Sequence, residues 1–573
     1  MSSSAFLPAT KKEMLERGWD YVDVVLITGD AYVDHPSFGV ALIGRWLEAH
    51  GYRVAILSQP RYHNPDDFRR FGKPRLFFGI TAGNVDSIVS NYTGNAKVRD
   101  FDDYSPQGNP YFGKEQSKTS RRKPDRASIS YSILARAAYK NISVVLGGLE
   151  ASLRRFVHYD FQQEKLRASV LTDSKADLLV YGMGERTVLE IAGRLEQGRG
   201  LSGIAGTCER ISDKEMKERG FEKPPLVLPS WQDIQKDVRK FMDAELDVDR
   251  HARALSQVPV LQSQQAMWVL QNKPAEPLKA AELDSLYCLP FARAPHPESG
   301  DVPAYRMIRH SVTIVRGCSG NCSFCAIARH QGPLIISRSH ESVLEEVKNI
   351  TMMPDFKGTI NDLGGPTANL YGTSCRNSSS CIKHDCLYPR VCNYLRMDEN
   401  AFVGLLEKIS RVKGVKHVFV SSGLQMELLL RTPRLLARLL DKHIPGVMKI
   451  APEHTEAGVL RLMHKQGSEI LSQFLKKCRE IALKQGKKIY FSPYFISAHP
   501  GCTLKDMEAL AEKIKRMGFS VRFFQDFTPT PGTLSTAMYV TGIDRNTLNP
   551  VYVPRKAGER REQRMILEKM RRR

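Results

Sequence analysis

The sequence of 573 residues has no uninterrupted apolar run of about 18 residues, the length that a membrane-spanning helix needs. Its N-terminus, MSSSAFLPATKKEMLERGWDY, has no basic patch followed by an apolar core and so does not resemble a secretory signal. No internal repeat is present. We therefore expect a cytoplasmic protein without a membrane partner, long enough to form about two or three domains.

Acidic residues are scarce relative to basic ones. The chain has 84 Lys and Arg against 62 Asp and Glu, a formal net charge of +22. Much of the surplus lies in SRRKPDR (120–126) and in the C-terminal stretch 555–573. Such a surplus could bind RNA or another polyanion, or it could form a solvated basic surface, and charge alone does not decide between them.

Disulfides are not expected in the cytoplasm, so the 11 cysteines indicate other roles. Seven of them lie between positions 318 and 392. The other four are scattered and are interpreted as small buried side chains: Cys208, Cys288, Cys478 and Cys502.

The N-terminal part alternates short β-branched runs with periodic helical segments. The runs are VDVVLIT (22–28), RVAIL (53–57), RLFFGI (75–80), ISVVLGG (142–148) and DLLVYG (177–182). Nearly continuous apolar strands separated by helices predict a parallel sheet covered on both faces. We expect a doubly wound α/β domain over 1–210, followed by a helical connecting region over 211–304.

The alternation resumes with six further runs. They lie at 311–315, 358–365, 415–423, 446–454, 487–497 and 520–530. Six strand–helix units predict a complete or partial parallel barrel over 305–540, followed by a basic tail over 541–573. Reactive groups in such barrels lie at the C-terminal ends of the strands.

Directly after the first of these runs comes RGCSGNCSFCAIARH, which contains Cys318, Cys322 and Cys325 in the spacing C-x3-C-x2-C. We call these three residues the cysteine triad. Thiolates suit iron–sulfur clusters and zinc, but structural zinc takes four protein ligands. Three cysteines in one loop leave one corner open, which in a 4Fe–4S cluster frees one iron for substrate.

A triad of this spacing, with the aromatic Phe324 before its last cysteine and a barrel strand before it, resembles the radical S-adenosylmethionine (SAM) superfamily. The chain as a whole resembles the uncharacterised YgiQ-type family. The resemblance implies a cobalamin-binding-like domain followed by a (β/α)6 partial TIM-type barrel. It also implies a 4Fe–4S cluster that binds SAM and receives one electron from a flavodoxin- or ferredoxin-like donor. SAM is then cleaved to methionine and a 5′-deoxyadenosyl radical, while the substrate stays unknown.

The same resemblance suggests further SAM-binding residues, namely Phe324, Gly364, Gly365 and Glu453. The two glycines match the superfamily's Gly-Gly-Glu turn, but Pro366 replaces the Glu. Asp362 or backbone carbonyls are the alternatives for binding the amine. Glu453 could equally be a carboxylate at the start of the next helix.

A second cysteine group follows in TSCRNSSSCIKHDCLYPRVCN, which contains Cys375, Cys381, Cys386 and Cys392. Four soft ligands in a short irregular stretch could bind zinc or a second iron–sulfur cluster. Redox-active thiols and the absence of any metal are the other interpretations.

The segments 142–155 and 177–195 resemble the cobalamin-binding-like domain that precedes many radical SAM barrels. The usual Asp-x-His-x-x-Gly motif is absent, and the nearest stretch is DHPSFG (34–39). We therefore predict a related fold in which cobalamin is an unlikely cofactor.

Two other functions stay open. One is an RNA-modifying, methylthiotransferase-like enzyme, although such enzymes usually carry three further cysteines in the N-terminal domain, where this chain has only Cys208. The other is a non-enzymatic nucleic-acid-binding protein stabilised by zinc or a cluster.

Overall fold

The computed structural model describes residues 5–113, 116–117, 119–378, 380–519 and 521–571. The chain divides into two compact units. The first comprises Met1–Asp247, Leu255–Leu278 and Ser285–Arg309, and the second comprises Val248–Ala254, Lys279–Asp284 and His310–Arg573. Among the described residues, no helix is both long and apolar enough to cross a membrane.

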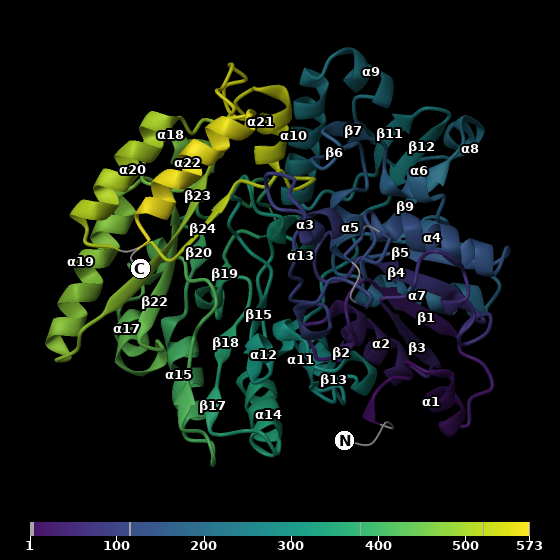
Figure 1. Ribbon diagram of the computed structural model, residues 1–573, viewed down its shortest axis with the longest axis horizontal. Helices are drawn as coiled ribbons and strands as arrows, with labels where there is room; N and C mark the ends of the chain where they lie inside the picture. The colour runs from purple at the N-terminus through teal and green to yellow at the C-terminus, as the bar shows by residue number, and fades with distance from the viewer. Residues whose placement is uncertain (1–4, 114–115, 118, 379, 520, 572–573) are drawn as a thin grey trace. The chain divides into compact units, whose positions relative to one another are not determined.

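The first unit is built on a nine-stranded sheet in the order β10-β11-β12-β9-β8-β5-β4-β1-β3 (Figure 1). The run from β8 to β3 is parallel, as predicted. Its strands are β1 (Val24–Thr28), β3 (Val54–Ser58), β4 (Phe77–Thr81), β5 (Ser143–Leu146) and β8 (Leu178–Val180). Every residue of β1 is buried, because both faces of the sheet are covered.

Helices cover the two faces. On one face, α2 (Gly39–Ala49) and α7 (Glu185–Glu196) share a core with alternate residues of the parallel strands. On the other, α4 (Ala127–Ala138) packs against α6 (Val170–Ser174), β4 and β5. This arrangement is the doubly wound α/β fold that the sequence predicted.

The sheet continues with β9 (Thr207–Ile211). Part of the region 211–304 also contributes strands to it, namely β10 (Leu226–Val227), β11 (Val260–Gln264) and β12 (Met267–Gln271). β11 and β12 form an antiparallel hairpin, and β12 pairs antiparallel with β9. Their polar positions, such as Gln262 and Gln271, are buried and hydrogen-bonded, so the apolar pattern of a strand is weak here.

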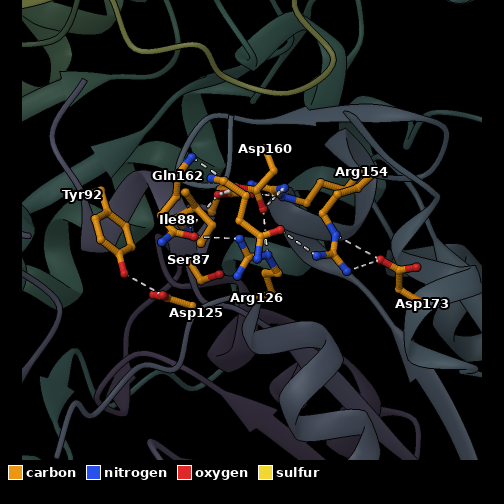
Figure 2. A network of polar contacts seen from close by, with 12 residues as sticks. Ser87, Ile88, Tyr92, Asp125, Arg126, Arg154, Asp160, Gln162 and Asp173 are labelled. Carbon is orange, nitrogen blue, oxygen red and sulfur yellow. Dashed lines mark hydrogen bonds and ion pairs between the residues drawn. The ribbon is translucent and has the colours of Figure 1, made fainter. Parts of the chain in front are cut away.

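Buried charges hold together the loops of the first unit (Figure 2). Asp86 caps helix α3 (Ser87–Asn91) and accepts hydrogen bonds from Arg154 Nε at 2.6 Å and Nη2 at 3.0 Å. Burial alone would raise the pKa of Asp86, but the Arg154 charge lowers it below its usual value. Arg126 Nε donates to Asp160 at 2.7 Å and thereby anchors the end of the polar stretch that precedes α4.

The second unit contains the six predicted barrel strands, and all of their pairings are parallel (Figure 1). β14 (Ser311–Thr313) pairs with β18 (Asp362–Gly364), and β17 (Thr359–Ile360) pairs with β21 (His417–Val418). β23 (Tyr490–Ser497) lies between β22 (Val447–Glu453) and β24 (Phe523–Asp526) and pairs with both. The intervening helices include α14 (His340–Thr351), α15 (Glu399–Ser410), α19 (Glu469–Lys484) and α20 (Leu504–Arg516). The (β/α)6 partial barrel is therefore confirmed.

The basic C-terminal stretch contains helix α22 (Ala557–Lys569), which packs against α20. Its buried Gln563 donates to the carbonyl of Cys502 at 2.7 Å and accepts from the Ala498 amide at 2.8 Å. These two bonds join the helix to the loop that follows β23.

Candidate functional site

The cysteine triad lies in the loop between β15 (Val315–Arg316) and α13 (Ile327–Gln331), directly after the first barrel strand. The amide of Cys318 donates to the carbonyl of Gly332 at 3.2 Å and closes the loop. Gly317 has a φ of 81°, and a Cβ there would lie 1.8 Å from the Leu334 carbonyl oxygen. The loop can therefore take this path only with glycine at position 317.

The three triad cysteines are all half-buried. Burial raises the pKa of all three, that of Cys325 to about 11. The positive charge of Lys465 opposes this rise. Because thiolate is the form that binds metal, a cluster that binds here must displace about three protons.

Across from the triad, Glu453 ends strand β22 with a φ of 66°. Its Oε2 is buried and has no hydrogen-bond partner among the described residues. Lys465 Nζ lies 4.0 Å from the other carboxylate oxygen and donates to the carbonyl of Ala451 at 2.7 Å. Burial raises the pKa of Glu453, and Lys465 counteracts that effect.

Lys465 also interacts with a second carboxylate. Glu427 lies in α16 (Met426–Leu429). Burial raises the pKa of its carboxyl, and the charge of Lys465 opposes that rise. The pKa of Lys465 is raised overall, because the carboxylates and the nearby thiols outweigh the burial that would lower it. One cation thus stands among two carboxylates and two thiols, Cys322 and Cys325.

The predicted Gly-Gly turn lies at the end of β18. A Cβ on Gly364 would lie 2.0 Å from Ser422 Oγ, and one on Gly365 would lie 2.4 Å from the Val315 carbonyl oxygen. Both glycines therefore permit close strand packing. Asp362 is the alternative acceptor for the SAM amine. Its carboxylate already accepts hydrogen bonds from the Ser422 amide at 3.0 Å and from the Ser422 hydroxyl.

The centre of the triad loop is bound by the end of the chain. The Ser323 hydroxyl accepts from Arg545 Nη1 at 2.8 Å, and the Ser323 carbonyl accepts from the Ser535 amide at 2.9 Å. The next residue, Phe324, sits edge-on to the ring of His499 with centroids 6.4 Å apart. The loop conformation thus depends on residues beyond the last barrel strand.

The second cysteine group lies in the loop between β19 (Ser374–Cys375) and β20 (Leu395–Arg396). The structure brings its members near one another, since Cys386 interacts electrostatically with the other three. Within the described parts of the chain, no three His, Cys, Asp or Glu side chains of either group converge tightly enough to hold a single metal ion.

Comparison with known proteins identifies the family. Residues 6–311 match the family model described as Radical SAM N-terminal, and residues 312–514 match that of the Radical SAM superfamily. A UPF0313 protein of Geobacter sulfurreducens is 46% identical over 98% of this chain and 92% of its own. The chain belongs to the UPF0313 family of radical SAM enzymes. A UPF0313 protein of Thermotoga maritima is 45% identical over 96% of both chains.

Solved structures similar to this UPF0313 chain include two radical SAM enzymes. TsrM from Kitasatospora setae, a methyltransferase with cobalamin and a 4Fe–4S cluster bound, gives a TM-score of 0.49 at 15% identity, covering 90% of this chain and 77% of that one. OxsB with aqua-cobalamin bound gives a TM-score of 0.47 at 10% identity, covering 91% of this chain and 56% of the OxsB chain. The methylthiotransferase-like and nucleic-acid-binding alternatives stay predictions.

Our prediction that cobalamin is an unlikely cofactor is wrong. The N-terminal family match and the two cobalamin-bound structures overturn it. The prediction depended on the missing Asp-x-His-x-x-Gly motif. That motif supplies one ligand to cobalt, and its loss leaves the rest of a cobalamin-binding-like domain in place. In this UPF0313 chain, Asp34 of the nearest stretch is committed to a buried ion pair with Arg45.

Sequence reasoning missed Lys465 and Glu427. Lys465 follows α18 (Ala457–Leu462), at the end of a segment singled out only for Glu453. Lys465 is one of several basic residues in RLMHKQG (461–467), and Glu427 is a lone acid in LQMELLL (424–430), so neither forms a motif with a recognisable spacing. Only folding brings both toward the triad.

Proposed function

We propose that this UPF0313 protein is a 4Fe–4S-dependent enzyme that cleaves SAM to a 5′-deoxyadenosyl radical, acting on a substrate still to be identified. The observation that supports it is the pairing of the tightly folded triad loop with a buried, unsatisfied Glu453 oxygen and Lys465 across from it. The donor set fits the cluster, because three soft thiolates leave one iron open. When bound, the reduced cluster would supply the one electron that splits SAM into methionine and the radical.

Each residue of the site has a distinct role in this proposal. Cys318, Cys322 and Cys325 would ligate three irons. Glu453 would accept a hydrogen bond from SAM through its free Oε2, and Lys465 would balance the charge of the thiolates and of the SAM carboxylate. Gly364 and Gly365 would let the SAM methionyl group approach the backbone, and Phe324 would shield the cluster from water.

The cluster needs an external electron. We propose a flavodoxin- or ferredoxin-like donor, and the net charge of +22 favours an acidic carrier. Reduction of the cluster by such a carrier should then slow as ionic strength rises, because screening weakens charge steering.

The test is anaerobic reconstitution followed by reduction with dithionite in the presence of SAM. Wild-type protein should release 5′-deoxyadenosine and methionine in equal amounts. Cys322→Ala should lose the product, whereas Cys288→Ala, which removes an exposed cysteine of the first unit, should keep it. A cluster that reduces fully but never yields 5′-deoxyadenosine would contradict the proposal.

A further inference from the structure

The second cysteine group lies in a loop whose two ends are fastened together. β19 and β20 pair antiparallel, with Cys375 opposite Leu395. The Arg376 amide donates to the Tyr394 carbonyl at 3.0 Å, which adds one more bond to this clamp. The described residues between the two strands contain no further helix or strand.

The cysteines lie at the points where this loop turns back on itself. The Cys392 amide donates to the carbonyl of Cys386 at 2.8 Å, which joins the third and fourth members of the group. Cys386 is 7% exposed, and it lies close enough to Cys375, Cys381 and Cys392 for a negative charge on any of them to repel its thiolate. Cys386 is thus the buried member of the group, and its backbone is bonded directly to that of Cys392.

Two of the sulfurs accept backbone hydrogen bonds. The Asn377 amide donates to Cys375 Sγ at 3.4 Å, and the His384 amide donates to Cys381 Sγ at 3.3 Å. Bonds of this kind stabilise a thiolate ligand and are a regular feature of the surroundings of iron–sulfur clusters. A packed thiol in an apolar core has no need of them.

The group is also attached to the triad loop. The Cys386 amide donates to the carbonyl of Ser319 at 3.3 Å, one residue after Cys318. The neighbouring Leu387 carbonyl accepts from Gln466 Nε2 at 2.7 Å, next to Lys465. Cys386 and Leu387 share a hydrophobic cluster with Cys318.

We propose that Cys375, Cys381, Cys386 and Cys392 ligate a second 4Fe–4S cluster, beside the triad. Four thiolates complete such a cluster, so no iron is left open and SAM does not bind it. The spacing C-x5-C-x4-C-x5-C favours iron over zinc. A single zinc ion draws its ligands from close pairs, whereas each cysteine of a 4Fe–4S cluster binds a different iron.

His384 is the one other soft donor in the loop. Its Nδ1 bonds the carbonyl of Arg253 at 2.5 Å, which assigns the ring proton to that nitrogen. Its Nε2 is buried and has no hydrogen-bond partner among the described residues, so the ring could also act as a donor. Four cysteines already supply one ligand to each of the four irons, so we keep the ligand set to them, and His384→Ala should retain the second cluster.

The deciding experiment compares metal content after anaerobic purification. Wild-type protein should hold about eight irons and eight sulfides per chain, and the triple variant Cys318→Ala/Cys322→Ala/Cys325→Ala about four of each. After reduction, the electron paramagnetic resonance signal of the triple variant should not change when SAM is added. The quadruple variant of the second group should also hold about four irons.

Three results would overturn the proposal: a triple variant without iron, a wild-type protein with about four irons and one zinc, or loss of the second cluster in His384→Ala. If the quadruple variant does not fold, the triple variant still decides, since it keeps all four cysteines of the second group. The outcome is separate from SAM cleavage. Eight irons without 5′-deoxyadenosine would refute the proposed function and leave the second cluster standing.

Discussion

The ammonium group of Lys465 lies 4.0 Å from the carboxylate of Glu453, and the two side chains are only 13% and 10% exposed. Both lie near the cysteine triad. The positive charge of Lys465 lowers the pKa of the Cys322 thiol, and the acidic groups around Lys465 raise its own pKa. A buried cation among acidic groups makes the charge of this pocket depend on one residue.

Replacing Lys465 by Met should weaken SAM binding by about 2 kcal/mol, roughly thirty-fold, because Glu453 is left buried without its cation. Equilibrium binding of SAM to the reconstituted protein measures the change. Lys449 lies on the exposed side of β22, the strand that ends at Glu453, so Lys449→Met should bind SAM like the wild type. Equal affinity in the two variants would refute the role of Lys465.

Gly317→Ala should abolish cluster loading while leaving the fold intact. The added methyl group would collide with the Leu334 carbonyl, and a φ of 81° is strained for alanine. Gly458→Ala in α18 is the control, since nothing lies within 4 Å of its Cβ position. Iron content and far-ultraviolet circular dichroism should show iron lost only in Gly317→Ala. Full iron in that variant would contradict this account of the loop.

Arg154→Met should destabilise the first unit by about 3–5 kcal/mol, because Asp86 would remain buried without its partner. Asp86 and Arg154 are 1% and 2% exposed. The control is Arg167→Met, whose ion pair with Asp173 is 22% exposed on both sides, so that its loss should cost at most about 1 kcal/mol. Urea denaturation compares the two, and similar losses would mean that the buried pair is not the stabilising element.

Acid should destabilise the second unit through His499. Burial lowers the pKa of this ring to about 3, and the ring bonds the Pro500 carbonyl and the Ser535 hydroxyl. An unfolded histidine titrates near pH 6.5, so the unfolded state binds the proton first. The stability is fully present above about pH 6.5 and is lost as pH falls toward 3.

Between pH 6.5 and 4.5 the free energy of unfolding should therefore fall by roughly 2–3 kcal/mol from this histidine alone. Urea denaturation at a series of pH values gives the slope. His499→Gln should show a shallower slope even if its stability at neutral pH is lower. An unchanged slope would show that other groups cause the acid sensitivity.

The sequence was sufficient for the framework of both units. The parallel strands of the first unit and the six barrel strands stand where the apolar runs predicted them, because strands buried on both faces must be nearly all apolar. The barrel strands are often shorter than the apolar runs, as in β21, because the hydrogen-bonded pairing covers fewer residues than the buried stretch does. β11 and β12 escaped prediction because buried glutamines interrupt their apolar pattern.

The candidate site was only half predictable. A triad in one loop is visible in the sequence because its members are local. Lys465 and Glu427 are brought to the triad by folding alone, and neither belongs to a sequence motif that marks it. The Gly-Gly pair shows that a matching motif does not by itself indicate a binding role. Packing against Ser422 and Val315 also requires glycine at positions 364 and 365.

The bonds from Ser323 to Ser535 and Arg545 also set an order of events in time. Arg545 follows Ser323 by 222 positions, so the triad leaves the ribosome long before its support exists. The loop can reach its final shape only once the end of the chain has folded onto it. We therefore expect insertion of the cluster to follow translation, and a chain cut short before position 534 to carry all three cysteines but to hold less iron than the full chain.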